Sequence, residues 1–215
     1  MTQPQCIIFD LDGVLTETSK QHFIAWSKMA EELGIPLDPS FEEDLKGVSR
    51  KESLEKILEY GQITLDDAAK EKYQAQKNAH YQTLIAQFSP DDLFEGMLEL
   101  LKDLQQKAVK IALGSASKNG PSLIKALGIE KYFDYVVDPR ACRSKPAPDI
   151  FLAAAHHFSL SAGECWGIED AIAGVKAIKS AGMYAVGIGN AHHLQDADIV
   201  FATPSLAAAW MMDQF

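Results

Sequence analysis

The sequence Cys6-Ile7-Ile8-Phe9-Asp10-Leu11-Asp12-Gly13-Val14 indicates both the class of fold and the place of its chemistry. Residues 6–9 form a short apolar run, which is typical of a strand buried on both faces of a parallel sheet. Two carboxylates, Asp10 and Asp12, follow at the point where this strand leaves the core, and Gly13 permits a tight turn and a close backbone approach. Ligands of open α/β sheets bind at the carboxyl ends of the strands. We therefore expect a functional site directly after this strand.

The two neighbouring carboxylates limit what this site can be. At an effective dielectric constant of about 20, two unit charges about 4 Å apart repel by roughly 4 kcal/mol, so the pair requires a cation, a shared proton or a solvated turn. A D-x-D-G sequence also begins like a calcium-binding loop. A calcium loop needs an acidic ligand at its twelfth position, where counting from Asp10 gives Gln21. The sequence around Asp10 alone leaves a plain turn and a cation site both open.

Length and composition are those of an ordinary globular chain of 215 residues with 47% hydrophobic residues. No run approaches the ~20 apolar residues of a membrane span, and no signal-like segment precedes the first strand, so we expect a cytoplasmic protein. The net charge of -10 disfavours nucleic acids and anionic membranes as partners but allows a small anionic substrate. We expect the three cysteines to be reduced, with Cys6 and Cys165 buried on strands.

Further apolar, β-branched runs alternate with helical patterns along the chain. The expected strands are 109–113, 165–168, 185–188 and 199–202, and the expected helices are 93–104, 121–127, 148–158 and 170–182. Regular alternation of this kind predicts an α/β fold with a doubly wound parallel sheet and right-handed crossovers.

The segment after the first strand interrupts that alternation. It contains no credible strand, and its helical signals are an apolar stripe from Phe23 to Leu33, a capping box at Ser49-Arg50-Lys51-Glu52 and a helical pattern over 65–85. We predict a core domain of residues 1–17 and 90–215 with a helical cap domain of residues 18–89 inserted after the first strand. A cap placed there could cover the carboxyl ends of the strands as a lid. A purely structural helical subdomain is an equally good interpretation of the pattern.

Polar residues that suit phosphate chemistry follow other predicted strands. Ser115 follows the second, Glu169-Asp170 end a later one, and Lys145-Pro146 lie in the loop between them. Taken singly, these could be a helix cap, an acidic helix start and a solvated lysine. Taken together with Asp10 and Asp12, they provide a carboxylate nucleophile, a proton donor, a hydroxyl and an ammonium for phosphoryl oxygens, and acids for a hard divalent cation.

The order of the four motifs DLDGV, ALGSAS, SKPAPD and GIEDA resembles the haloacid dehalogenase superfamily over essentially the whole chain. The resemblance implies a Rossmann-like core and one Mg2+ per subunit, an aspartyl phosphate formed on Asp10, and Asp12 as general acid and base. The metal would be held by the Asp10 carboxylate, the backbone carbonyl of Asp12 and Asp170, with Glu169 binding directly or through water.

Within that superfamily, the stretches LKGVSRKESL, QKN and ALGSASKNGP are similar to sugar phosphomutases that interconvert β-glucose 1-phosphate and glucose 6-phosphate through β-glucose 1,6-bisphosphate. The resemblance implies a substrate and phosphate site with contributions from the cap and from the core. The cap residues are Thr18, His22, Trp26, Gly47, Val48, Ser49, Arg50, Ser53, Lys77 and Asn78, and the core residues are Ser115, Ala116, Ser117, Lys118, Asn119 and Lys145.

A mutase must grip a phosphate at both ends of its bisphosphate intermediate, and Arg50 suits the distal phosphate because its guanidinium can bind phosphate with two hydrogen bonds. Structural readings stay open for single residues: His22 and Arg50 could be surface groups of helices, and Trp26 suits a core better than a sugar platform. A Mg2+-dependent sugar-phosphate phosphatase would use the same core, and a non-enzymatic sugar-phosphate sensor would not need Asp12. No apolar stripe is left over, so we expect a monomer.

Overall fold

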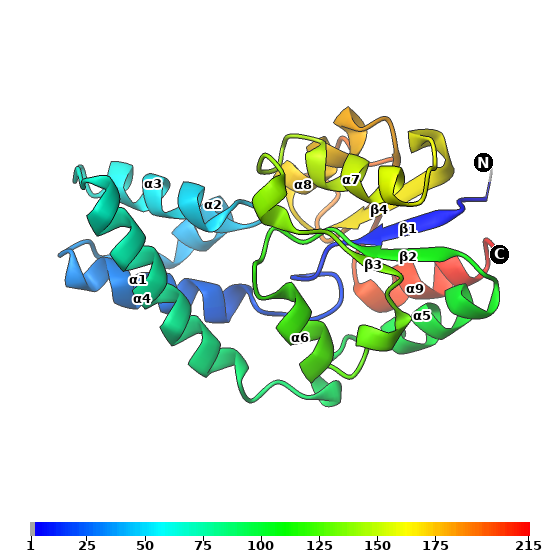
Figure 1. The fold of residues 1–215 in the computed structure, drawn as a ribbon, viewed down its shortest axis with the longest axis horizontal. Helices are drawn as coiled ribbons and strands as arrows, with labels where there is room; N and C mark the ends of the chain where they lie inside the picture. Colours follow the sequence, from blue (N-terminus) through cyan, green and yellow to red (C-terminus); the bar gives the residue numbers. More distant parts are fainter. Residues whose placement is uncertain (1–2) are drawn as a thin grey trace. The chain divides into compact units, whose positions relative to one another are not determined.

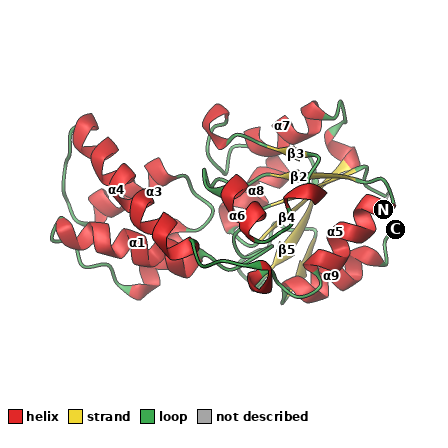
Figure 2. Cartoon of the chain, turned by 60° about the horizontal axis from the view of Figure 1, so that its bottom comes forward, coloured by secondary structure: helices red, strands yellow, loops and turns green. Residues whose placement is uncertain are grey.

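The computed structural model describes residues 3–215, and its internal contacts divide the chain into two compact units. The core unit comprises the residues up to Glu17 together with Phe88–Phe215, and the cap unit comprises Thr18–Gln87. Figures 1 and 2 show the difference in their composition, since strands occur in the core unit and the cap unit is drawn as helices and loops.

The core unit contains a parallel sheet in the order β3-β2-β1-β4-β5-β6, in which every neighbouring pair of strands is parallel. The strands are β1 (Cys6–Phe9), β2 (Lys110–Leu113), β3 (Tyr135–Val136), β4 (Cys165–Glu169), β5 (Tyr184–Ile188) and β6 (Ile199–Phe201). The apolar run at 6–9 is the central strand, and all of its residues are buried, as expected for a strand covered on both faces. The predicted doubly wound α/β fold is confirmed.

Helices cover both faces of this sheet (Figure 1). On one face lie α7 (Asp149–His157) and α8 (Ile172–Ser180), whose Phe151 and Ile178 pack in one cluster with Ile8 of β1. On the other face lie α5 (Met97–Gln106) and α9 (Pro204–Met212), and α6 (Gly120–Ala126) follows β2. The alternation of strand and helix therefore winds to both sides of β1 and leaves the carboxyl ends of the strands at one edge.

Three details differ from the sequence expectations. Strand β3 was not predicted, because its two residues are half-buried and too few to show a period. Helix α5 begins at Met97, since Gly96 adopts a left-handed φ of 83° and Leu93 precedes the helix. Helix α8 begins at Ile172 rather than at Asp170, and no acidic residue lies in its first turn. The reading of Glu169-Asp170 as an ordinary helix start is therefore wrong.

The chain leaves and re-enters the core unit at one short seam. Thr16 forms an isolated antiparallel bridge with Leu93, and the Phe94 N–H donates to the Leu15 carbonyl at 2.9 Å. The Thr16 hydroxyl also donates to the carbonyl of Asp92 at 2.6 Å. The two segments that lead to the cap unit are thus tied together inside the core unit.

The cap unit is built from α1 (Ser19–Glu32), α2 (Glu42–Leu45), α3 (Arg50–Tyr60) and α4 (Asp67–Ile85). Its hydrophobic core includes Trp26 and Met29 of α1 and Leu54 of α3. The predicted capping box at the start of α3 is confirmed, because the Ser49 hydroxyl accepts from the Glu52 N–H at 3.3 Å and the Glu52 carboxylate accepts from the Ser49 N–H at 3.1 Å.

Cys6 and Cys165 are paired neighbours on β1 and β4, and both are buried as free thiols, which confirms their predicted place on strands. Within residues 3–215, no helix combines the length and apolar character that crossing a bilayer requires.

Candidate active site

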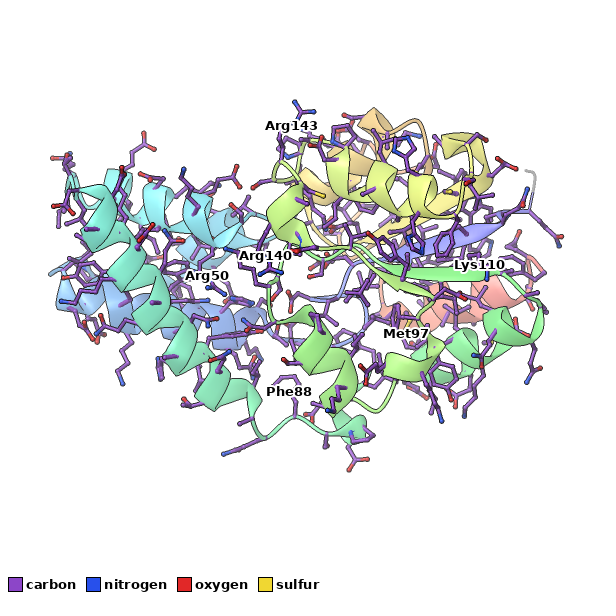
Figure 3. The ribbon with its side chains drawn as sticks, viewed as in Figure 1. Arg50, Phe88, Met97, Lys110, Arg140 and Arg143 are labelled. Carbon is purple, nitrogen blue, oxygen red and sulfur yellow. The ribbon has the colours of Figure 1, made fainter. Side chains whose placement is uncertain are left out.

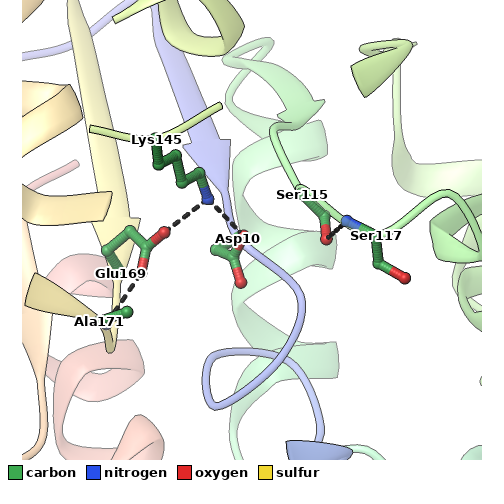
Figure 4. A network of polar contacts seen from close by, with 6 residues as sticks. All are labelled: Asp10, Ser115, Ser117, Lys145, Glu169 and Ala171. Atoms are coloured by element: carbon green, nitrogen blue, oxygen red, sulfur yellow. Dashed lines mark hydrogen bonds and ion pairs between the residues drawn. The ribbon is translucent and has the colours of Figure 1, made fainter. Parts of the chain in front are cut away.

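The acidic motif lies at the point where the sheet changes its winding direction. β1 pairs with β2 on one side and with β4 on the other, and Asp10 and Glu169 stand at the carboxyl ends of β1 and β4. Connections run to opposite sides of the sheet from such a switch point, so the loops diverge and leave a crevice above the strand ends. Ser115, which follows β2, lies at the same edge (Figure 4).

Lys145 is held between the carboxylates of Asp10 and Glu169. Its Nζ donates to Asp10 Oδ1 at 2.6 Å and to Glu169 Oε1 at 2.5 Å, as Figure 4 shows. Only 2% of the lysine is exposed, and its ammonium lies 5.3 Å from the centre of the Phe151 ring. Burial acts to lower the pKa of Lys145, but the two adjacent carboxylates outweigh it and raise that pKa above its ordinary value. The site therefore keeps a buried positive charge beside Asp10.

Glu169 is fully buried, and both of its carboxylate oxygens have protein partners. Oε1 accepts from Lys145, and Oε2 accepts from the backbone N–H of Ala171 at 2.9 Å. Burial raises the pKa of Glu169 to about 7, although the attraction of Lys145 acts in the opposite direction. The carboxylate is thus fixed in direction by a cation on one side and by a backbone amide on the other.

Asp170 completes a cluster that can hold a metal ion. One carboxylate oxygen each from Asp10, Glu169 and Asp170 lies within 4.8 Å of the other two. Gly13 has a left-handed φ of 73°, and a Cβ placed on it would overlap the Asp170 carboxylate. The predicted tight turn at Gly13 is confirmed, because only glycine lets the chain after β1 pass this near to Asp170. Three carboxylates form a hard oxygen donor set, which fits a cation such as Mg2+.

The loop after β2 is held by hydrogen bonds of its own serine side chains. The Ser115 hydroxyl accepts from the Ser117 N–H at 3.1 Å, and the Ser117 hydroxyl accepts from the Asn119 N–H at 3.3 Å. Ser115 and Asn119 are buried, Ala116 and Ser117 are half-buried, and Lys118 is exposed. The predicted core residues 115–119 therefore form one compact turn at the strand edge that also carries Asp10.

A buried basic cluster lies within the cap unit. Lys77 Nζ is 2.7 Å from His22 Nδ1 and stands 4.8 Å and 4.7 Å from the ring centres of Trp26 and Tyr81. The His22 ring stacks on Tyr81 with centroids 4.0 Å apart. Burial, then the charges of Lys77 and Arg50, hold the pKa of His22 well below its ordinary value, so the imidazole is neutral. Nδ1 then accepts from the Lys77 ammonium.

Tyr81 is a member of this cluster that the sequence analysis did not single out. It is fully buried, and it follows Lys77 by four residues on α4, so that the two side chains share one helix face. The four-residue spacing from Lys77 was the feature of the sequence that could have identified Tyr81. The other aromatic residue, Trp26, lies in the hydrophobic core of the cap unit with 2% of its surface exposed.

Arg50 lies at the first turn of α3 and contacts α4. Its Nη2 donates to Asn78 Oδ1 at 2.7 Å (Arg50 is labelled in Figure 3), and burial lowers the pKa of the guanidinium. The remaining predicted cap residues lie near helix starts: Thr18 is buried before α1, Gly47 has a left-handed φ of 69° before Val48 and Ser49, and the Ser53 hydroxyl donates to the Ser49 carbonyl at 3.1 Å. These contacts place the predicted cap residues within one unit.

Comparison with known proteins fixes the family. Residues 4–182 match the haloacid dehalogenase-like hydrolases. The chain belongs to this haloacid dehalogenase family. Membership makes it an enzyme and implies the use of a divalent metal, and the cluster of Asp10, Glu169 and Asp170 could hold such an ion.

Individual members of the haloacid dehalogenase family resemble the chain over most of its length. It is 45% identical to a β-phosphoglucomutase of Bacillus subtilis over 199 residues, which cover 91% of this chain and 88% of the relative. It is 28% identical to a phosphorylated carbohydrates phosphatase of Thermotoga maritima over 208 residues, with 94% and 93% covered. The crystal structure of a β-phosphoglucomutase from Clostridium difficile superposes with a TM-score of 0.94 at 38% identity, with 99% and 98% covered.

Proposed function

We propose that the protein is a β-phosphoglucomutase, an isomerase that interconverts β-D-glucose 1-phosphate and D-glucose 6-phosphate. The observation that carries the proposal is the 45% identity with the Bacillus mutase over 91% of the chain. The arrangement of Asp10, Lys145 and Glu169 supports it, because it provides an anionic nucleophile with a fixed cation beside it.

Phosphoryl transfer is assigned to Asp10 and Asp12. A carboxylate oxygen of Asp10 attacks phosphorus, the bond between phosphorus and the sugar oxygen breaks, and an aspartyl phosphate forms. Asp12 gives its proton to the departing sugar oxygen and later takes a proton from the hydroxyl that attacks the phosphorylated enzyme. The same pair thereby serves both half-reactions, with β-glucose 1,6-bisphosphate between them.

Lys145 lowers the electrostatic cost of bringing two anions together. Its ammonium is buried 2.6 Å from Asp10 Oδ1, where the charge is little screened by solvent. Ser115 and its turn are assigned to the oxygens of the transferring phosphoryl group, together with Ala116, Ser117, Lys118 and Asn119.

Mg2+ is assigned to Asp10, Asp170 and the backbone carbonyl of Asp12, with Glu169 acting through water. Both Glu169 oxygens already accept a hydrogen bond from Lys145 or Ala171, which supports its place behind the ligands rather than among them. When bound, the cation neutralises charge on the phosphate and on Asp10 during the transfer.

The distal phosphate is assigned to Arg50. Its guanidinium is partly withdrawn from water, and its hydrogen bond to Asn78 orients it in the cap unit. The rest of the predicted set, Thr18, His22, Gly47, Val48, Ser49, Ser53 and Lys77, is assigned to sugar binding and to closure of the cap, residues 18–89, which would exclude water from the aspartyl phosphate. The burial of Trp26 supports a packing role for that residue.

The test is an assay that follows two products at once. β-Glucose 1-phosphate is supplied with Mg2+ and a trace of β-glucose 1,6-bisphosphate, glucose 6-phosphate is measured with a coupled dehydrogenase, and inorganic phosphate is measured in parallel. Rapid formation of glucose 6-phosphate with little free phosphate supports the mutase. Free phosphate without glucose 6-phosphate contradicts it.

Arg50→Ala and Lys51→Ala form a matched pair for the assignment of the distal phosphate. Both residues lie in the first turn of α3, but Lys51 is exposed. We expect Arg50→Ala to suppress formation of glucose 6-phosphate by about 10²-fold or more, since a hydrogen bond to a charged group contributes about 1.5–3 kcal/mol and Arg50 can donate two. Lys51→Ala should retain the parental rate, and equal effects of both substitutions would contradict the assignment.

A sugar-phosphate phosphatase is the second candidate, favoured by the similarity to the Thermotoga phosphatase at 28% identity. It would use the same core residues and release phosphate. For either activity we propose a cytoplasmic monomer. The large apolar side chains that are exposed among the described residues, Ile24, Tyr60, Ile172 and Leu206, lie on four different helices, which supports the monomer.

A further inference from the structure

We propose that Gly174 is a positioning residue, whose missing side chain allows Glu169 to hold Lys145 in the active site. The inference deepens the proposed function and rests on it for the role of Lys145. Gly174 lies in the first turn of α8 and is buried. A Cβ built on it would meet Glu169 Oε1, Cδ and Cγ, all well inside the closest approach of 3.0 Å that real Cβ atoms keep.

Glu169 has no room to yield to such a Cβ. The side chain is fully buried, and its carboxylate is bound on both sides by Lys145 Nζ at 2.5 Å and by the Ala171 N–H at 2.9 Å. Moving the carboxylate away from α8 would lengthen at least one of these hydrogen bonds. The three nearest atoms to the absent Cβ all belong to Glu169, so this side chain is the first that a Cβ at residue 174 would displace.

Displacement of Glu169 would affect the active site by changing the contacts of Lys145. Its Nζ bridges Glu169 and Asp10, and Asp10 shares the acidic cluster with Asp170. A displaced Glu169 would release Lys145 from one of its two carboxylates and leave it to pair with Asp10 alone. Groups that orient metal ligands typically change metal affinity by 10- to 100-fold when they are altered.

The first experiment measures Mg2+ binding by calorimetry on Gly174→Ala in the absence of substrate. Glycine to alanine in a helix normally stabilises a protein, because alanine restricts the unfolded chain. We expect Gly174→Ala instead to destabilise the protein and to weaken Mg2+ binding. The Mg2+ dissociation constant should rise by about 10- to 100-fold. An unchanged dissociation constant in a folded variant would overturn the proposal.

Gly167→Ala is the matched control for a merely structural effect. Gly167 lies on β4, and a Cβ there would overlap Ile178 of the same helix α8 rather than a carboxylate. This variant should lose thermal stability while it keeps the Mg2+ dissociation constant within about twofold of the parent. If both glycine variants weaken Mg2+ binding equally, general misplacement of α8 explains the effect and the proposal fails. Gly163→Ala is a second control, because no atom lies within 4 Å of a Cβ built there, and it should leave both thermal stability and Mg2+ binding unchanged.

Shortening the glutamate provides a rescue test. The double variant Glu169→Ala/Gly174→Ala lacks all three glutamate atoms that the new Cβ would meet, so the clash is removed. Gly174→Ala should therefore lower the thermal midpoint far less in the Glu169→Ala background than in the parent, and effects that simply add would overturn the proposal. Should Gly174→Ala fail to fold while Glu169→Ala folds, a folded double variant would support the clash and an unfolded one would refute it. These readouts need no substrate, so they decide the role of Gly174 even if the mutase assay is negative.

Discussion

Replacement of Lys145 by methionine tests the electrostatic arrangement of the core site. Methionine keeps most of the length and apolar stem of lysine but removes the charge that Asp10 and Glu169 share. At an effective dielectric constant of about 20, each pair of unit charges at such a distance attracts by about 6 kcal/mol, and much of this offsets the cost of burying the charges. Removing one partner of a buried ion pair costs about 3–5 kcal/mol, because the remaining charge is left uncompensated. We expect Lys145→Met to lower the free energy of unfolding by that amount.

The assay is equilibrium unfolding in urea, with and without Mg2+. The cation binds the carboxylates that the variant leaves uncompensated, so it should restore part of the loss; a ligand at 100 times its dissociation constant contributes about 2.7 kcal/mol. Lys179→Met is the control, because the pair of Lys179 and Asp198 is partly exposed, with 37% and 28% of the side-chain surfaces accessible. Such pairs contribute about 0–1 kcal/mol. A loss in Lys145→Met no larger than in this control would refute the reasoning.

Three further predictions concern separate parts of the molecule. Asp10→Asn should abolish turnover and Asp12→Asn should slow it by about 10²- to 10⁴-fold in the coupled assay, and equal residual rates would contradict their assigned roles. Because the pKa of folded His22 lies below its ordinary value of about 6.5, the unfolded chain binds the proton first, so the free energy of unfolding should fall as the pH drops below about 6.5, by up to about 1.4 kcal/mol per pH unit. Urea titrations at several pH values should show a shallower decline for His22→Gln, in which Lys77 and Arg50 keep their charges. Ser49→Ala should cost about 1 kcal/mol in the same titration, since it removes the capping box of α3, and no change would contradict that role.

Much of the core unit could be predicted because its signals are local. The run at 6–9 is apolar throughout, and the later strands are bounded by glycine or acidic residues, so the central strands and the parallel winding were evident. Strand β3 was not predicted, because two half-buried residues at a sheet edge are too few to show an alternating hydrophobic pattern. The start of α8 was misplaced by two residues because an acidic pair is usual at helix starts, whereas Glu169 and Asp170 here belong to a cluster that could hold a metal ion.

The candidate site residues could be proposed from the sequence, but their contacts could not. The order of Asp10, Ser115, Lys145 and Glu169 along the chain indicated one edge of a sheet. Nothing in that order says that Lys145 bridges two carboxylates. Glycine is required at residue 174 because α8 packs closely against the end of β4. This packing is a tertiary contact, which sequence periodicity does not encode.

The seam between Thr16 and Leu93 makes the inserted helices separable from the sheet in a topological sense. The segments at Thr16 and Leu93, through which the chain leaves and re-enters the core unit, are hydrogen-bonded neighbours. A linker of a few residues could therefore replace the cap unit and join these two segments, and the strand order of the sheet would stay the same. A domain inserted in this way can be exchanged between relatives or lengthened at little cost in chain entropy, because the ends that must meet are already together. The sheet and its acidic cluster can therefore stay the same while the inserted cap unit is replaced.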